Sequence, residues 1–309
     1  MTIHPLTACP PPELAAALAR FEAGFTYPLG PGRSFRISHG DDYPRFYRAM
    51  GDAVCFVAER DGEVLGVLAA ALRPLVGPDG AVRQAVYLGD MKVAPAARGG
   101  RVLVRLAEAT TAWATGRADV GFAVVMGGTP VTPDRYTGRL GLPAFAEVAR
   151  VAILRLPAAA DGGDAVEVGA DEGEALFRRL TAGHYAAAGG DPRERSETPP
   201  AWLVLADGSA CGRLEDTRRA KRLISDDGGE MVSAHLSGFA YAAPAAGLAL
   251  LAAARARAAA HGFPALFVAV PAADAAPFAT APGAVVAPAS VYGAGVERGA
   301  AWVVNTAEV

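Results

Sequence analysis

The sequence predicts an α/β protein with a mixed, α+β type of sheet, built from two similar halves. Three observations support this prediction. Apolar strand patterns alternate with helical ones along the chain, a segment near the middle is rich in Ala, Gly and acidic residues, and one strand-turn-helix-strand pattern occurs twice. A chain of 309 residues is long enough for two domains of about 150 residues each.

The first half is predicted to begin with helices and to continue with three strands. A Pro-rich entry precedes the first helix, and Asp41 is a candidate cap for a second helix with an aromatic face. Asp61-Gly62 and the Gly-Pro-Asp-Gly run at 77–80 mark the turns between the strands. The predicted elements are helix 13–21, strand 34–38, helix 41–50 and strands 53–59, 63–74 and 84–93.

A helix follows, because apolar side chains from Val102 to Trp113 fall on one face of the pattern. The predicted elements to the end of this half are helix 101–115, strand 120–126, a short helix near 135–148 and strand 150–156. Residues 157–174 are interpreted as a linker. The second half is predicted to contain helix 174–187, strands 202–206, 210–224 and 230–242, helix 246–260 and strand 265–270.

Two short segments of the first half recur in the second. The Ala-Pro-Ala-Ala run at 94–97 recurs at 243–246, and the apolar strand that starts at Phe122 recurs at Phe267. In both copies, the start of the helix and the Phe of the strand that follows it lie 21 residues apart. The second copy is therefore shorter than the first only in the turn before the helix. Coincidence in an Ala-rich chain is the alternative. Because four elements agree in order and length, duplication is favoured, with domains at 1–157 and 158–309.

Composition limits the class of protein and its partners. The net charge of −3 offers no basic footprint for nucleic acid. Three scattered cysteines without a CxxC pair favour a reduced, cytoplasmic setting and argue against zinc, and no metal is expected. The first residues lack the layout of a signal peptide, and no run of about 18 uncharged apolar residues predicts a membrane partner.

The turn between strand 84–93 and helix 101–115 has the pattern of a phosphate-binding loop. The first N–H groups of a helix have no partner within the helix, and they favour an anion. Glycines let backbone approach a ligand, and two arginines add positive charge. The residues of this candidate site are Met91, Val93, Arg98, Gly99, Gly100, Arg101 and Val102.

The order Val93-x-Pro95-x-x-Arg98-Gly99, followed by a helix, resembles the acyl-CoA-binding motif of the GCN5-related N-acetyltransferases (GNAT). The elements over 34–156 are similar to the core of that family, and the second half resembles a degenerate copy through the repeat. The resemblance implies a cleft where strand 84–93 splays from strand 120–126. It implies acetyl-CoA, or another acyl-CoA, as co-substrate, with the pyrophosphate on the turn amides.

One departure from the family pattern concerns the turn itself. Counted from Arg98, Arg101 and Leu103 stand where the family has Gly and Gly or Ala, so the turn is one residue short. An ordinary strand–helix connection, with glycines for tight packing, is the alternative to a CoA site. In the second copy the helix start at Gly247 lacks arginines and a Gly pair, so no second CoA site is expected there.

Two candidate catalytic residues follow from the resemblance. Tyr136 lies in a segment that is similar to the family's Tyr-x-x-x-Gly pattern, with one extra residue before Gly141, and it is implied to protonate the departing thiolate. A packed aromatic side chain is the alternative. Asp90 is a candidate general base, and an ion pair with Lys92 on the sheet surface is the favoured alternative. His39 is interpreted as a surface or core histidine.

The sequence therefore indicates an acyl-CoA-dependent N-acyltransferase, most simply an N-acetyltransferase, in which an amine attacks the thioester directly. The acceptor is expected to be a small-molecule or peptide amine, and a homodimer is left open. The alternative is a non-catalytic acyl-CoA-binding sensor or interaction protein with tandem domains. A longer acyl chain or a carrier-protein thioester is a further alternative for the donor. The basic stretch 213–222 is interpreted as a solvated strand face, or as a contact to an acidic substrate or the CoA phosphates.

Overall fold

The computed structural model describes residues 1–28, 33–139 and 142–309. The strands of the first half are β1 (Thr2–Leu6), β2 (Tyr27–Pro28), β3 (Ser34–Ser38), β4 (Asp52–Arg60), β5 (Glu63–Val76), β6 (Val82–Val93), β7 (Val120–Met126) and β8 (Ala146–Pro157). Its helices are α1 (Pro12–Ala23), α2 (Arg45–Arg48), α3 (Val102–Ala114) and α4 (Pro133–Tyr136), and η1 (Pro95–Ala97) is a 3₁₀ turn.

The second half has the same mixture of elements. Its strands are β9 (Val166–Val168), β10 (His184–Ala187), β11 (Ala201–Val204), β12 (Ala210–Glu215), β13 (Arg222–Ser225), β14 (Ala234–Tyr241), β15 (Ala265–Pro271), β16 (Val285–Ala294) and β17 (Ala301–Val303). Its helices are α5 (Ala170–Leu180), α6 (Pro244–Ala260) and α7 (Ala275–Phe278), with 3₁₀ turns η2 (Pro192–Glu194), η3 (Ala272–Asp274) and η4 (Thr306–Glu308).

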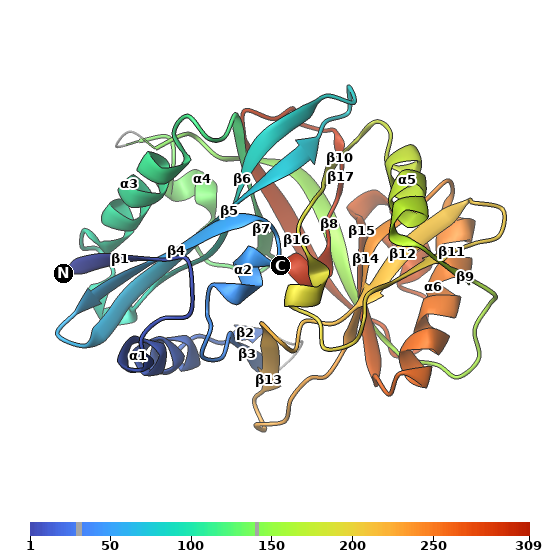
Figure 1. The fold of residues 1–309 in the computed structure, drawn as a ribbon, viewed down its shortest axis with the longest axis horizontal. Coiled ribbons are helices and arrows are strands. Elements are labelled where there is room, and N and C mark those ends of the chain that lie inside the picture. Colours follow the sequence, from blue (N-terminus) through green and yellow to red (C-terminus); the bar gives the residue numbers. More distant parts are fainter. Residues whose placement is uncertain (29–32, 140–141) are drawn as a thin grey trace.

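One mixed sheet runs through both halves (Figure 1) in the order β1-β4-β5-β6-β7-β16-β8-β15-β14-β12-β11-β9. The series β1-β4-β5-β6-β7 from one edge matches the series β9-β11-β12-β14-β15 from the other. α3 connects the parallel strands β6 and β7, and α6 connects the parallel strands β14 and β15. The predicted α/β fold with a mixed sheet and a duplicated unit is confirmed.

The two halves exchange their last strands at the centre of the sheet. β8 of the first half pairs with β15, so that Leu154 lies opposite Val268. β16 of the second half pairs with β7, so that Val291 lies opposite Val124. β8 and β16 also pair with each other, and Figure 1 shows them side by side where the halves meet. The predicted domain boundary after residue 157 stays a prediction.

Three predicted elements are wrong in type or extent. The helix near 135–148 is the single turn α4, because the Thr137 hydroxyl donates to Pro133 O at 2.7 Å and accepts the Phe145 N–H at 3.0 Å, which returns the chain into β8. Helix 41–50 is reduced to α2. Helix 174–187 is displaced, since α5 already begins at Ala170 within the expected linker and β10 follows it.

The predicted strand 210–224 is also wrong, because it divides into β12 and β13, which belong to different sheets. Between them the buried Asp216 carboxylate accepts the N–H groups of Glu197, Thr198 and Arg218 at 3.1, 2.8 and 2.9 Å. A carboxylate that accepts several backbone donors competes with the ladder and forms a turn. The sequence does not predict the strands β1, β2, β9, β16 and β17.

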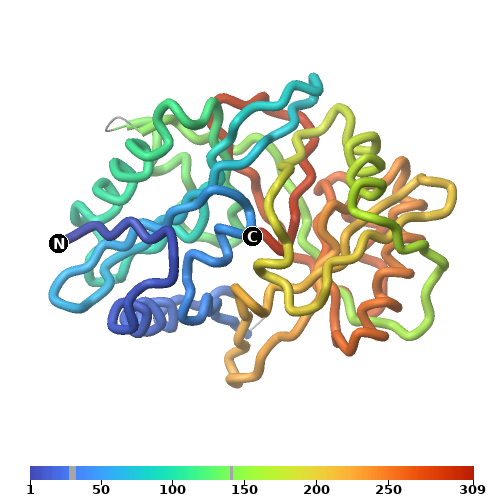
Figure 2. The backbone as a smooth tube through the Cα atoms, in the orientation of Figure 1, coloured from blue at the N-terminus to red at the C-terminus, as the bar shows by residue number. Residues whose placement is uncertain are grey.

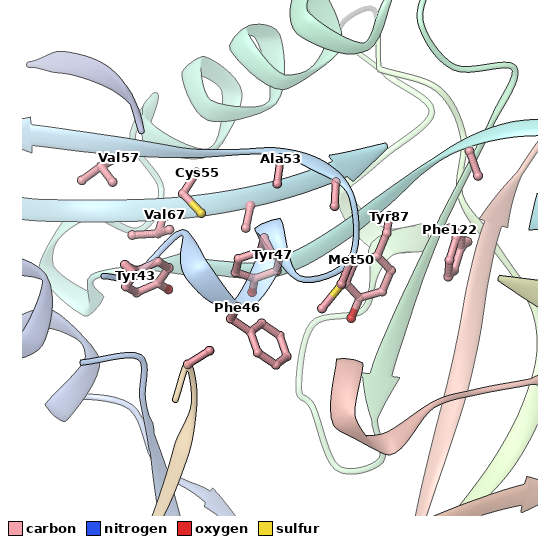
Figure 3. Close-up of a cluster of buried hydrophobic side chains, with 14 of the residues drawn as sticks. Tyr43, Phe46, Tyr47, Met50, Ala53, Cys55, Val57, Val67, Tyr87 and Phe122 are labelled. Carbon is pink, nitrogen blue, oxygen red and sulfur yellow. The ribbon is translucent and has the colours of Figure 1, made fainter. Parts of the chain in front are cut away.

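The sheet of the first half is packed on both faces. Figure 3 shows one face, where Tyr43, Phe46 and Tyr47 lie against β4, β5 and β6. On the other face α3 packs through Val102, and a Cβ on Gly66 of β5 would come within 2.8 Å of that side chain. A residue without a side chain is therefore required in β5 for α3 to lie this close.

A small second sheet joins the two halves over the centre of the molecule. β13 of the second half pairs with β3, and β3 pairs with β2. Figure 2 shows the end of the chain, in red, reaching the same central region. No helix among the described residues is both long and apolar enough to cross a membrane.

The central packing of β16 can be tested with two valines of that strand. Val291 is fully buried, whereas Val286 is 43% exposed. Val291→Ala is expected to lower the free energy of unfolding by about 2 kcal/mol, since two buried methyl groups are lost at about 0.8 kcal/mol each and a small cavity remains. Val286→Ala is expected to cost less than about 0.5 kcal/mol. Urea unfolding measures both, and equal losses would contradict the central position of β16.

Candidate active site

A cavity opens where β6 and β7 separate. The two parallel strands pair only from Ala85 opposite Val120 to Tyr87 opposite Phe122. Beyond this point they diverge, and a cavity of about 260 Å³ lies between them, which we call the cleft. Its lining comes from β6, β7, α3 and α4, and from Lys221 and Val309 of the second half. The splay that the sequence predicts between these strands is present.

β6 carries a bulge beside the cleft. Its register against β5 shifts between Val67 and Ala69, where Gly89 to Lys92 of β6 has one residue more than the partner strand. Asp90, in this bulge, has a φ of +50°, which a residue with a side chain rarely adopts. A bulge leaves a residue out of the ladder and redirects the strand. Strained backbone of this kind concentrates at functional sites.

Asp90 is part of a buried cluster of charged groups. Its carboxylate accepts the Tyr43 hydroxyl at 2.8 Å and lies 2.9 Å from Lys92 Nζ. Glu22 lies 2.6 Å from His39 Nδ1 and 3.7 Å from Lys92 Nζ. The other ring nitrogen of His39 is 3.5 Å from Asp90. The predicted Asp90–Lys92 pair therefore exists, although it is buried in the cleft wall instead of lying on the sheet surface.

These contacts argue against Asp90 as the general base. Burial alone would raise the pKa of Asp90, but Lys92 and His39 hold that pKa well below its usual range. A carboxylate with so low a pKa has little affinity for the proton of an ammonium. Asp90 lines the cleft, as a base near the acyl group should, but its surroundings favour a fixed anion.

The ligand atoms of Glu22, His39 and Asp90 lie within 4.8 Å of one another, a spacing that suits a metal ion. The ammonium of Lys92 already stands against both carboxylates, at 2.9 and 3.7 Å. A divalent ion at this point would face that ammonium at close range, so the residues do not fit a metal site well. The expectation of no metal stays a prediction.

The turn before α3 has the features of an anion site. Gly99 has a φ of +78°, a conformation that favours glycine, and Gly100 precedes a helix start without a side-chain cap. Arg98 and Arg101 are exposed and form no ion pair with any described residue. The N–H groups of the first turn of α3 are thus accompanied by two unpaired cations.

The other predicted cofactor-binding residues differ in what they offer. Met91 lines the cleft. The half-buried Val93 and the buried Val102 pack with the core between the sheet and α3, so these two can contact a ligand only through their backbone.

Tyr136 lies on the rim of the cleft. It ends α4 and lines the cavity, whereas Gly141 of the same motif lies outside the described residues. Burial raises the pKa of Tyr136 to about 12, with Tyr292 contributing. The phenol is therefore protonated at neutral pH and can donate a hydrogen bond into the cleft.

Lys221 is the cleft residue whose importance the sequence did not reveal. It is buried, it lies over the Phe46 ring at 4.4 Å, and its Nζ donates to the main-chain oxygen of Val309. It makes no salt bridge to a described residue, and burial lowers its pKa to about 7. One signal was available, because the chain contains only two lysines, Lys92 and Lys221, and both line the cleft.

The corresponding splay in the second half is filled by the chain itself. β14 and β15 pair only at Ala234 and His235 and then separate. Asn305 Oδ1 accepts the Gly238 N–H at 2.8 Å, and Thr306 Oγ1 lies 2.9 Å from His235 Nδ1. The expectation that the second copy holds no CoA stays a prediction.

The segment that fills this splay is anchored by a buried ion network. Arg73 of β5 contacts Glu308 at 2.8 and 3.2 Å, and Arg195 contacts it at 3.4 Å. Tyr87 donates to the Glu308 main-chain oxygen at 2.8 Å. Burial alone would raise the pKa of Glu308, but the two arginines lower it to about 2. The network places Val309 in the wall of the cleft.

The sheet order and the duplication define a fold with two GNAT-like copies, and among the described residues the splay between the parallel strands is open in the first copy and filled in the second. Neither a family model nor a curated protein matches the sequence. Among solved structures, the chain is similar to Saccharomyces cerevisiae N-myristoyltransferase with bound myristoyl-CoA, a GNAT-fold enzyme, with a TM-score of 0.63 and 10% identity. The similarity covers 95% of this chain and 82% of that one.

A second solved structure is similar over most of its length. It is a conserved protein from Enterococcus faecalis described as a probable N-acyltransferase, with a TM-score of 0.51 and 11% identity. The similarity covers 95% of this chain and 72% of that chain. At such identities the likeness is one of fold, and the tandem GNAT-like fold predicted from the sequence is confirmed.

The ion network predicts an acid-sensitive contribution to stability. Because the pKa of Glu308 falls from 4.5 to about 2 on folding, the stabilisation is complete above pH 4.5 and is lost as the pH falls towards 2. Glu308→Gln is expected to lower the free energy of unfolding by about 3 kcal/mol at pH 7, and by much less near pH 2. Urea unfolding at several pH values measures this.

The control for this prediction is Glu197→Gln, at a side chain that is 38% exposed, and it should have little effect on the free energy of unfolding. A loss at pH 7 that persists unchanged at low pH would contradict the assignment.

Proposed function

We propose that the protein is an acyl-CoA-dependent N-acyltransferase that works in the cleft of the first half. The observation that supports this most strongly is the composition of the cleft wall. The cavity is lined by Leu103 of the first turn of α3, by the bulged strand β6 and by a lysine of the second half, whereas Arg98, Gly99, Gly100, Arg101 and Val102 are not among its lining residues. A candidate anion site at the start of α3 therefore stands beside this cavity, and a candidate proton acceptor stands in its wall.

The proposed position of the CoA pyrophosphate is the uncapped start of α3. Free N–H groups and the helix dipole favour a phosphate there, and Arg98 and Arg101 add positive charge. The acyl group would lie on the apolar wall of the cleft, formed by Leu68, Leu88, Leu103, Ala107 and Phe145. Acetyl-CoA is the simplest donor, and the wall also suits a longer chain.

The proposed reaction is direct transfer. The neutral amine attacks the thioester carbonyl carbon, the new C–N bond forms, and collapse of the tetrahedral oxyanion breaks the C–S bond and releases the CoA thiolate. Holding both substrates in one cavity supplies much of the acceleration. Backbone N–H groups released by the bulge at Asp90 are suited to the oxyanion.

Lys221 is the proposed acceptor of the amine proton. At neutral pH about half of a group with a pKa near 7 is unprotonated, which suits a general base. The Asp216 turn holds Lys221 in position, because the Lys221 N–H and C=O are both hydrogen-bonded to Thr217, at 2.7 and 2.9 Å. This base comes from the second half, so we propose that both halves build one active site.

The role proposed for Tyr136 is to stabilise the leaving thiolate by a hydrogen bond. Full proton transfer from a phenol of pKa about 12 to a thiolate of pKa about 8.5 is uphill by about 5 kcal/mol. The Lys221 ammonium, with a pKa of about 7, is the better final donor. The proton removed from the amine can thus be returned to the thiolate.

The competing function is a non-catalytic acyl-CoA sensor. The short turn before α3 favours it, because Arg101 and Leu103 occupy positions where glycine would admit a phosphate more closely. A sensor binds acyl-CoA but releases no thiol in the presence of amines. Only the proposed enzyme requires an amine acceptor, which would be a small molecule or a peptide; the sensor does not.

Binding of the nucleotide part can be tested by calorimetric titration with acetyl-CoA and CoA. Arg98→Ala and Arg101→Ala are each expected to weaken binding of both roughly tenfold, because a charge-assisted contact to phosphate is lost. Arg105→Ala removes an exposed arginine one turn further along α3 and is the matched control. Unchanged affinity in the first two variants would exclude the turn as the phosphate site.

The proton path can be tested by the dependence of kcat on pH. The rate is expected to rise with pH and to level off above an apparent pKa of about 7, since only neutral Lys221 takes a proton. Lys221→Met should lower kcat by about 10²–10⁴-fold and abolish this rise. Tyr136→Phe, as a comparison, should lower kcat without moving the midpoint. A midpoint retained in Lys221→Met would assign the base elsewhere.

A further inference from the structure

A second cavity adjoins the cleft. It has a volume of about 190 Å³ and lies between the small sheet and the strands β8, β15 and β16. The two cavities share a wall that consists of Tyr27, Ile37, Met126, Lys221 and Val309. We call this second cavity the acceptor cavity. The side chain of Lys221 stands between it and the cleft.

The acceptor cavity is apolar except for positive charge. Phe35, Leu223, Met231 and Phe267 are among its walls, and the only residues with formal positive charge are Arg155 and Lys221. No Asp or Glu side chain occurs among the described residues that line it. His235 is also in the wall, but burial and the nearby Lys221 lower its pKa well below the usual range, so it is neutral.

Arg155 has no counter-charge among residues 1–28, 33–139 and 142–309. Its guanidinium lies 5.9 Å from the Phe267 ring centroid, and it forms neither a salt bridge nor a hydrogen bond with any described residue. The residue is half-buried, and its Nε is buried without a partner among the described residues. A buried polar group without a partner costs free energy, and a carboxylate is the ligand that best matches the donor fork of arginine.

We infer that the acceptor cavity binds the amine substrate, and that this substrate is a small molecule with an apolar body and a carboxylate that pairs with Arg155. The inference rests on the proposed function. The apolar body lies against Phe35, Leu223 and Phe267, and the amine reaches the wall at Lys221 that the two cavities share. A cavity needs about 10–15 Å³ for one water molecule, so this one holds on the order of ten non-hydrogen atoms. Apolar amino acids have this size and chemistry.

Three related amines test the inference by release of CoA thiol from the same acyl-CoA. Phenylalanine carries the carboxylate, phenylalaninamide replaces it by a neutral amide, and phenethylamine lacks it. The expected kcat/KM for phenylalanine exceeds that for either neutral amine by roughly tenfold or more, because only the carboxylate pairs with Arg155. Equal kcat/KM values for the three amines, or higher values for the two amines that lack a carboxylate, overturn the inference.

Arg155→Met provides the matched variant, since it removes the charge and keeps an apolar side chain of similar length. It is expected to raise KM for phenylalanine at least tenfold and to leave KM for phenethylamine and for the acyl-CoA unchanged. Arg150→Met, on the same strand at a 73% exposed side chain, is the control and should change neither value. Thermal unfolding of both variants shows that they are folded. An unchanged preference for phenylalanine in Arg155→Met overturns the inference.

The same measurements distinguish this inference from the proposed function. If no amine releases thiol, titration of the protein with phenylalanine and phenylalaninamide in the presence of CoA still reports on the cavity. Tighter binding of the acid supports the acceptor cavity although the transfer reaction fails. Transfer to neutral amines without preference for the acid supports the reaction and overturns the acceptor cavity.

Discussion

The exchange of β8 and β16 holds the two halves of the sheet together. Each half lacks the strand that closes its own sheet and receives it from the other half. The backbone hydrogen bonds of both edges are satisfied only in the complete chain, so the halves cannot separate without exposing them. The exchange also places Arg155 of β8 opposite Phe267 and Val285 of the second half, which creates the acceptor cavity.

Duplication followed by divergence explains why one cleft is open and the other closed. Both copies keep parallel strands that separate, with a helix between them. In the second copy, Asn305 and Thr306 occupy the splay, and the Glu308 network holds them there. The closed copy still contributes to the wall of the open cleft, because the turn at Asp216 leads to Lys221, which lines that cleft.

Electrostatic surroundings give the two lysines of the cleft different properties. Lys92 stands beside the carboxylates of Asp90 and Glu22, which keep it charged although it is buried. Lys221 contacts the Phe46 ring and the Val309 main-chain oxygen and forms no salt bridge with a described residue, so burial dominates and lowers its pKa to about 7. The same residue type is a fixed charge in one place and a titrating group in the other. Arginine could not take the second role, because it stays charged.

Local sequence patterns were sufficient to predict the apolar strand 120–126, the helix after the glycine turn, and the repeat that indicates duplication. These rest on spacing and turn chemistry that neighbouring residues share. The sequence did not predict the elements whose structure depends on contacts with residues far away in the chain. The Asp216 turn needs donors from residues 197 and 198, and β16 is a strand because β7 and β8 lie on either side of it. Only the tertiary structure brought Lys221 and Arg155 to their cavities, because burial and the loss or gain of a counter-charge arise from residues far apart in the chain.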